Sequence, residues 1–408
     1  MRRSSLLVVF LTVFVDLLGF GIVIPLLPLY TKDYGGSELT GGLVVGAFSA
    51  MQFLFAPFWG RLSDRLGRRP VLATTLLGTA LSYLLFAFAR DLTVLFAART
   101  LAGFFGANIP VAQAYVADVT TPETRARGMG MIGMAFGLGF VLGPAFGALL
   151  SEHVGRAAPG LAAAALSGTA FVIAWARLPE SLSPELRSKA SARRAHPILF
   201  LSQALRRPEL GGVLVLFFFL VAGFANLESM LSYFVEDRYG WGKLEVGRLF
   251  AFIGLCIAFA QGFLFRRAAA RFGEVRLLRT GPLFVAAGMQ VFWLVPVWPL
   301  LLPAVAIVAL GMGMSNPSVP SLISKRSPPH MQGQTLGLSQ SLGALARAVA
   351  PPVAGLLYDR VRVPSEGGCV TPFLWGGVLL VVGLALGRRG LVATAADAAP
   401  PAAAPSVE

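Results

Sequence analysis

The chain has 408 residues, of which 56% are hydrophobic and only 13% are charged, and its formal net charge is +14. Soluble domains carry about a quarter charged residues, so this composition excludes an ordinary soluble protein. Long uncharged runs recur instead, at 71–89, 128–151 and 210–227. Each can cross a bilayer core of roughly 30 Å as a helix, whereas a β-barrel would show alternating segments of about ten residues. The composition predicts an all-α polytopic membrane protein.

The apolar runs predict twelve spans. The first resembles a signal peptide, but Asp16 within it and the lack of a small-residue cleavage site favour a retained span. The uncharged run 280–324 is too long for one crossing, and "PVWP" (296–299) divides it in two. The predicted spans are 6–30, 41–60, 71–89, 92–117, 129–150, 158–176, 211–235, 245–265, 277–295, 298–323, 334–358 and 369–387.

The distribution of Lys and Arg predicts the orientation. One set of joints, which includes both termini, carries 24 of the 34 basic residues, the opposite set carries 8, and two (Arg99 and Arg347) fall within spans. Basic joints remain on the cytoplasmic side. We therefore expect a multi-pass protein of the inner (plasma) membrane with both termini in the cytoplasm. The basic residues serve topology in this interpretation, so no nucleic-acid partner is expected.

The chain divides into two halves in this prediction. Residues 1–176 form one six-helix bundle, 177–210 a cytoplasmic linker, 211–388 a second bundle and 389–408 a disordered tail. "RLSDRLGRRPVL" (61–72) matches "RAAARFGEVRLL" (267–278) at an offset of 206 residues, and "GPAFGALL" matches "PPVAGLLY" at 208. Such a parallel repeat is typical of transporters with a central site between the halves.

Four motifs in chain order carry a resemblance to a known family: "GRLSDRLGRR" (60–69), "DLLGFGIVIPLLP" (16–28), "RTLAGFFGA" (99–107) and "GLGFVLGPAFGALL" (137–150). With them the chain resembles the major facilitator superfamily, and within it the twelve-span drug:proton antiporters. The resemblance implies two six-helix pseudo-repeat bundles and export of small compounds in exchange for protons.

The tetracycline-efflux proteins are similar over "SAMQFLFAPFWGRLSDRLGRRPVL" (49–72). Those proteins carry an Asp in span three where this chain has Ser82, and an Asp in span nine where it has Ala286–Ala287. They also carry a His in span eight, near Cys256–Ile257, that this chain lacks. Part of the substrate and proton machinery of that subfamily is therefore missing, which argues against tetracycline itself.

Ionisable residues inside predicted spans are expensive to insert and are functional by default. Asp16 and Arg99 lie at similar depth in the first half, so we expect Asp16 to carry the proton and Arg99 to tune it; the alternative is a static ion pair. Glu228 is either a second cavity acid or a group at the water interface. Arg347 either pairs with Glu228, touches an anionic part of the substrate, or extends from the cavity wall towards water.

Polar side chains in other spans are candidates for lining a substrate cavity, although hydrogen bonds between helices are their commoner use. This set comprises Gln52, Asn108, Gln113, Asn226, Gln261, Asn316, Gln340 and Arg347. Gly139, Gly143 and Gly147 share one helix face, where backbones can approach closely, and Pro144 can kink the span. The resemblance adds the role of an antiporter hinge to these four residues.

The joint at 60–70 contains more than the arginines that topology requires. Gly60 is expected to allow close helix approach and Gly67 a tight turn. The Asp64 carboxylate can lie against a helix N-terminus or an arginine, and Arg68 can pair with Asp118. The resemblance implies a latch that reaches the start of span eleven (333–337) and holds the outward-facing state. The predicted latch comprises Gly60, Asp64, Arg65, Gly67, Arg68, Arg69 and Asp118.

We therefore predict a secondary active transporter that exports small amphiphilic compounds by alternating access, with H⁺ as the coupling ion. It is expected to act as a monomer in the lipid bilayer, without a cofactor. The alternatives are an importer or facilitator of a small metabolite, and a non-transporting membrane sensor. No nucleotide-binding loop, metal-ligand spacing or nucleophile triad is visible in the sequence, so no enzyme is expected.

Overall fold

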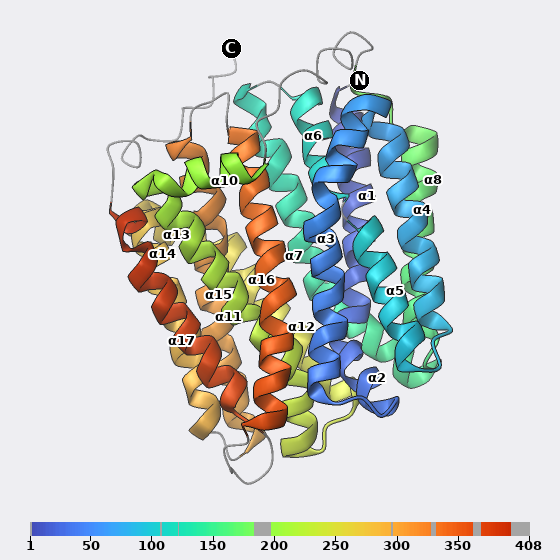
Figure 1. Cartoon of the computed structure of the whole chain (residues 1–408), viewed down its shortest axis with the longest axis vertical. Helices are drawn as coiled ribbons and strands as arrows, with labels where there is room; N and C mark the ends of the chain where they lie inside the picture. Colours follow the sequence, from blue (N-terminus) through green and yellow to red (C-terminus); the bar gives the residue numbers. More distant parts are fainter. Residues whose placement is uncertain are drawn as a thin grey trace.

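The computed structural model describes residues 2–106, 108–120, 122–182, 197–294, 297–327, 332–361 and 369–392. Within these ranges the regular structure is helical and no β-strand occurs. Figure 1 shows the long helices side by side, with the start of α1 and the end of α17 at the same end of the molecule. We call that end the terminal side and the opposite end the far side.

The first half of the chain forms one bundle. A short turn of 3₁₀ helix, η1 (Ile24–Leu26), interrupts its first span at Pro25, which cannot donate a backbone hydrogen bond. The helices of this half are α1 (Arg2–Val23), α2 (Leu27–Asp33), α3 (Glu38–Leu66), α4 (Arg68–Ala87), α5 (Leu92–Phe105), α6 (Ile109–Val119), α7 (Pro122–His153) and α8 (Ala158–Arg177).

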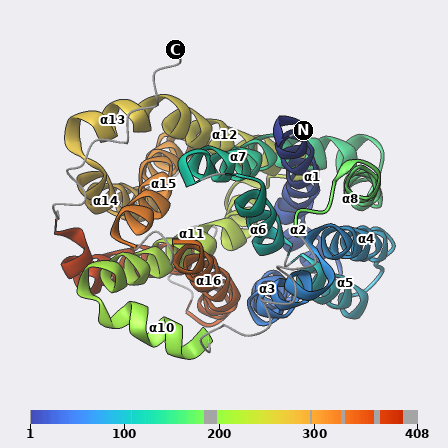
Figure 2. The ribbon, with the colours of Figure 1, turned by 90° about the horizontal axis from the view of Figure 1, so that it is seen from above.

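The second half forms a bundle beside the first, as Figure 2 shows from above. A five-residue π-helix, η2 (Ala260–Leu264), lies within its second span. The remaining elements are α10 (Pro197–Arg206), α11 (Pro208–Tyr239), α12 (Lys243–Phe259), α13 (Phe265–Phe272), α14 (Glu274–Val291), η3 (Phe292–Leu294), α15 (Trp298–Arg326), α16 (Gln332–Arg360), α17 (Thr371–Leu386) and η5 (Gly387–Leu391).

The arrangement confirms the predicted fold class. Within the described ranges, ten helical segments are long and apolar enough to cross a membrane. Helices α7 and α14 occupy the two other positions where the sequence predicts spans. The predicted linker contains a helix, α10, that packs against α11. Of the predicted tail, residues 393–408 lie outside the described ranges, as do 183–196 of the linker.

The fourth predicted span is broken in the middle. Helix α5 ends at Phe105 and α6 begins at Ile109. Pro110 at the start of α6 explains why a helix begins there, since the first turn of a helix needs no backbone donor. Asn108 stands at the start of α6 but does not use its side chain to cap it. The break therefore leaves the Asn108 amide available for another partner.

Glycines bring α1 and α7 together along their length. A Cβ added at Gly143 would lie 2.5 Å from the backbone carbon of Gly21, and one at Gly147 would lie 2.2 Å from the backbone oxygen of Ile22. A Cβ at Gly139 would lie 2.9 Å from backbone atoms of Leu17. The close approach predicted for this glycine face is confirmed, because any larger side chain would push the two backbones apart.

The two halves meet at the far side. Near the start of α3, an added Cβ at Gly42 would lie 2.2 Å from the backbone oxygen of Pro351 on α16. Helices α7 and α12 form a second contact between the halves, where an added Cβ at Gly247 would lie 2.0 Å from the side chain of Ala148. In this conformation the α3–α16 pair and the α7–α12 pair therefore pack closely at the far side.

Charged side chains connect the halves at the same end. Lys32 donates to Asp237 at 2.7 Å and to Glu236 at 3.1 Å. Asp33 accepts from Lys243 of the other half at 3.2 Å and lies 3.5 Å from Arg156 of its own half. We call these residues, Lys32, Asp33, Arg156, Glu236, Asp237 and Lys243, the far-side charge cluster.

We expect Gly143→Ala to lower the thermal unfolding temperature in detergent, because its new Cβ meets backbone that cannot move aside alone. Overpacking of this kind costs about 1–3 kcal/mol. Gly168→Ala is the matched control, because at Gly168 an added Cβ meets no described atom within 4 Å. The control should match or exceed the wild-type unfolding temperature, since Ala favours helix over Gly by about 0.5–1 kcal/mol. Equal unfolding temperatures for the two variants would contradict the close packing.

Candidate functional site

The joint between α3 and α4 holds a buried ion-pair network. Arg68 binds Asp64 at 2.7 Å through Nη1 and Asp118 at 3.1 Å through Nε. Its Nη1 also donates to the hydroxyl of Ser63 at 2.6 Å. Asp64 and Arg68 are only 5% and 6% exposed, so the pairing satisfies charges that have lost water. The structure thus brings together Asp64, Arg68 and Asp118, three of the five charged residues that the sequence predicts for the latch.

Glu180 completes this network and was not predicted from the sequence. Its carboxylate accepts the backbone N–H of Arg68 at 2.9 Å and of Arg69 at 3.2 Å, the first two residues of α4. An acid at a helix N-terminus satisfies free backbone donors and opposes the positive end of the helix dipole. The neighbouring Ser181 donates to Asp118 at 2.9 Å. One indication of this role was visible in the sequence: Glu180 lies in the predicted cytoplasmic linker, on the same side of the membrane as the basic joint at 60–70.

The other predicted latch residues differ in their surroundings. Gly67 has φ of +111°, which confirms the tight turn. At Gly60 the prediction of close helix approach is wrong, because an added Cβ would meet no described atom within 4 Å. Arg65 is exposed, and Arg69 donates to the backbone oxygen of Trp175 and covers its ring at 5.5 Å. The predicted contact with 333–337 stays a prediction, since the first side chains of that segment lie outside those described.

Asp16 lies in the middle of α1 and is held by two hydrogen bonds. Asn108 donates to its Oδ2 and Ser167 donates to its Oδ1, both at 2.9 Å. The break before α6 positions the Asn108 amide, and Ser167 comes from α8. Ser167 was missed because a lone serine in an Ala-rich span has no distinguishing signal. Three spans therefore converge on one carboxylate.

Arg99 is not paired with Asp16. Among the described residues the two form no ion pair, although Tyr83 lies within electrostatic range of both. Arg99 is 2% exposed, with its guanidinium 4.5 Å from the ring centroid of Phe48. Its Nε and Nη1 have no hydrogen-bond partner in the described part of the chain. A buried arginine with free donors is costly unless something else compensates its charge.

Glu228 on α11 supplies part of that compensation. It lies within electrostatic range of both Arg347 of its own half and Arg99 of the other half. Neither arginine approaches it within 4 Å, and its buried Oε1 has no hydrogen-bond partner among the described residues. The acid is thus placed between two cations without being locked to either. This arrangement favours the cavity interpretation of Glu228 over a position at the water interface.

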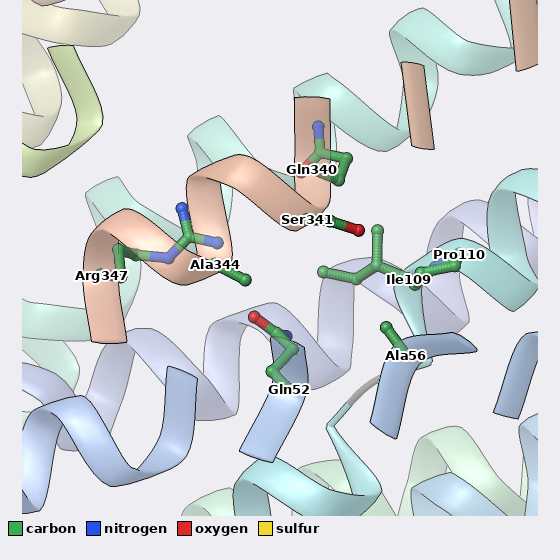
Figure 3. A pocket seen from close by; sticks show the side chains of 8 residues that line it. All are labelled: Gln52, Ala56, Ile109, Pro110, Gln340, Ser341, Ala344 and Arg347. Atoms are coloured by element: carbon green, nitrogen blue, oxygen red, sulfur yellow. The ribbon is translucent and has the colours of Figure 1, made fainter. Parts of the chain in front are cut away.

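A pocket lies where α3, α6 and α16 meet, between the two halves (Figure 3). Its volume of about 30 Å³ holds only a water molecule or two, far less than a drug-sized ligand requires. In Figure 3 the side chains of Gln52 and Arg347 face each other across the space. The pocket is lined by Gln52, Ala56, Ile109, Pro110, Gln340, Ser341, Ala344 and Arg347.

Of the residues predicted to line a substrate cavity, some line this pocket and the others do not. Gln52, Gln340 and Arg347 line the pocket, and the Gln52 amide also donates to the Gly106 backbone oxygen at 3.0 Å. Asn108 serves Asp16 instead. The remaining members lie outside the pocket: Asn226 is fully buried in α11, Asn316 is exposed, and Gln113 and Gln261 are half-buried.

Pro144 lies inside α7, which continues unbroken through it. Its backbone oxygen would lie 3.0 Å from a Cβ added at Gly247 on α12. The glycine–proline segment therefore faces α1 within its own half and α12 in the other half. It lies at the junction between the halves, while its predicted role as a hinge remains a prediction.

Comparisons with known proteins agree with this arrangement. The family model of the Major Facilitator Superfamily matches residues 9–351. The chain is 32% identical to the class C tetracycline resistance protein of Escherichia coli over 94% of each chain. It is 34% identical to bovine major facilitator superfamily domain-containing protein 10 over 86% of each.

Solved structures match over nearly the whole chain. The human organic anion transporter MFSD10 (TETRAN) superimposes with a TM-score of 0.72 at 30% identity, covering 95% of this chain and 99% of that one. A bacterial homologue of the human lysosomal transporter Spinster gives a TM-score of 0.74 at 15% identity, covering 95% and 96%, which shows the fold alone. From its paired helical bundles and these matches, the chain belongs to the Major Facilitator Superfamily of membrane transporters.

Proposed function

We propose that this transporter exports small amphiphilic compounds across the plasma membrane in exchange for protons, with both termini in the cytoplasm. The observation that carries the proposal is the Asp16 carboxylate in the middle of a span, held by neutral donors rather than by a cation. A carboxylate in that setting can bind and release a proton as water reaches it from one side and then the other. Proteins that confer tetracycline and multidrug resistance are among the relatives.

The proposed cycle uses the two ends of the molecule in turn. With the far side closed, compound would enter the space around Gln52 and Arg347 from the terminal side. Opening of the far side would then release it, and Asp16 would take up a proton on return. The Arg68 network is proposed to act as the latch that holds the terminal side when the far side opens. No cofactor enters this cycle, and the chain is proposed to act as a monomer.

Asp16→Asn should abolish compound-driven proton exchange, because the amide keeps the shape of the carboxylate and one of its two acceptor oxygens but cannot bind and release a proton. In inverted membrane vesicles, exchange by the wild type is measured as the loss of a pH gradient when compound is added. In Asp16→Asn the gradient should persist. We expect a decrease of at least about tenfold in rate, more than about 1.4 kcal/mol.

The control for this experiment is Asp91→Asn. Asp91 caps α5 at the exposed far side, and Asn caps a helix about as well. It should exchange protons like the wild type. Wild-type exchange rates in Asp16→Asn at equal expression would rule out Asp16 as the proton carrier. A gradient that no compound disturbs in wild type would favour a facilitator or a sensor instead.

Asp64→Asn should slow transport by at least about tenfold while the protein still folds. Arg68 keeps its bond to Asp118, so the variant avoids the 3–5 kcal/mol cost of leaving a buried charge wholly unpaired. Uptake rates in vesicles and the unfolding temperature would be measured together. Arg61→Gln removes an exposed charge from the same joint and should behave like wild type. Normal transport by Asp64→Asn would show that the joint serves topology alone.

A second candidate within the same mechanism is transport of organic anions. The observation that favours it is Arg347 in the wall of the pocket between the halves, together with similarity to a protein described as an organic anion transporter. A guanidinium is well suited to bind a carboxylate or phosphate.

Arg347→Gln tests this candidate. Loss of a charge-assisted hydrogen bond of about 1.5–3 kcal/mol should weaken binding of anionic compounds roughly ten- to a hundredfold. Neutral compounds should be little affected. Arg360→Gln, at the exposed far end of the same helix, is the control. Equal effects on anionic and neutral compounds would argue against anion recognition by Arg347.

A further inference from the structure

The helical span from α12 to α13 presents an exposed stripe that the transport mechanism does not use. Leu255, Phe259 and Phe263 are 60%, 52% and 54% exposed, and the two phenylalanine rings stack at 5.6 Å. Residues four apart share one face of a helix. Continuing that spacing leads to Arg267 and Arg271, both exposed. The stripe is thus apolar along most of its length and basic at its terminal-side end.

An apolar groove of about 450 Å³ runs beside the stripe, between α12 and α15. It lies on the outside of the second bundle, away from the pocket between the halves. Its lining contains no charged or amide side chain: Leu255, Cys256, Phe259, Ala306 and Leu310. Because the chain spans a membrane, an apolar groove on this face is open to lipid acyl chains.

The position of the basic residues follows from helix length. The continuous span Lys243–Phe272 has 30 residues, and at 1.5 Å per residue it is about 45 Å long. Lys243 belongs to the far-side charge cluster. A hydrocarbon core of roughly 30 Å therefore ends near Arg266 and Arg267, about 35 Å along the helix. These guanidinium groups lie at the headgroup level of the leaflet on the terminal side.

Among the described residues, no acid forms an ion pair with the basic end. Helix α13, "FRRAAARF", contains no acidic residue. Glu274, at the start of the next helix, is already bound by Lys325 at 3.1 Å and by Ser321 at 2.8 Å. Arg267 is fixed along the stripe, since it donates to the Phe263 backbone oxygen at 3.4 Å and its guanidinium lies 4.0 Å from the Phe263 ring.

We propose that this surface binds an anionic phospholipid from the leaflet on the terminal side. One acyl chain lies in the α12–α15 groove, and the phosphate is bound by Arg266, Arg267 and Arg271. Basic groups at the headgroup level beside a groove between spanning helices are suited to anionic lipid, since each near the surface contributes about 1 kcal/mol of attraction. The groove supplies the apolar half of the site, which a soluble phosphate would not use.

The test measures thermal unfolding of the purified full-length protein in detergent with added phosphatidylglycerol or phosphatidylcholine. A ligand that binds the folded state raises the unfolding temperature. We expect a larger upward shift with phosphatidylglycerol in wild type. Most of that extra shift should be lost in the triple variant Arg266→Gln, Arg267→Gln, Arg271→Gln, and separately in Ala306→Phe, which fills the groove. Each shift is taken relative to the same variant without lipid.

The control variant removes Arg388 and Arg389, two exposed basic residues elsewhere on the terminal side, by substitution with Gln. It should retain the phosphatidylglycerol shift. If it loses the shift as fully as the triple variant, the attraction is general and the proposed site is wrong. Equal shifts with both lipids, or an unchanged shift in Ala306→Phe, would also overturn the proposal. Glycerophosphoglycerol, the headgroup without chains, should give no shift, and a shift as large as that of the lipid would refute the groove.

Discussion

The hydrocarbon core of a membrane offers no hydrogen-bond partners, and this constraint determines where charge can stand in the chain. Asp16 is tolerated in the middle of a span because two neutral donors from other helices bind its oxygens. The Asn108 donor stands at the break in the fourth span, just before Pro110 begins a new helix, and its amide is not used to cap that helix. The break that interrupts one helix thus stabilises the acid on another.

Arg99 and Glu228 show the other solution to the same constraint. Neither has a full set of hydrogen bonds among the described residues, yet each lies within electrostatic range of the other across the two halves. The electrostatic interaction between Arg99 and Glu228 depends on the distance between the two halves, because each residue belongs to a different half. A movement that opens one side therefore changes the electrostatic free energy at the centre.

The positions of the spans were predictable because hydrophobic runs and basic joints record the bilayer directly in the sequence. The Gly139–Gly143–Gly147 face was predictable for a similar reason, since a spacing of four places residues on one side of a helix. The partners of Asp16 and the α4 N-terminus were not. Ser167 and Glu180 lie 151 and 112 residues along the chain from the groups they bind, so only the folded bundle brings them together.

The prediction for Gly60 and the alternative of a static Asp16–Arg99 ion pair both failed, because in each case the sequence specifies only part of the geometry. Gly60 was expected to lie at a close helix approach. A glycine permits such an approach without requiring it, and no described atom lies within 4 Å of a Cβ added at Gly60. The ion-pair alternative for Arg99 and Asp16 rested on their similar depth in the first half. Depth gives one coordinate, whereas pairing also requires the two side chains to face each other around the bundle. Sequence supplies the first and the packing of helices supplies the second.

The strength of the far-side closure can be judged from its parts. Lys32, Asp33, Glu236, Asp237 and Lys243 are about a quarter to two-fifths exposed, and ion pairs in such surroundings each contribute about 0–1 kcal/mol. The closure therefore depends more on the apolar contacts of α3 with α16 and of α7 with α12, where glycines let backbones touch. Those contacts are specific in register but contain few polar bonds to break. A transporter must keep its two states within a few kcal/mol of each other, and an interface made of small residues and exposed charges can open without leaving buried charge unpaired.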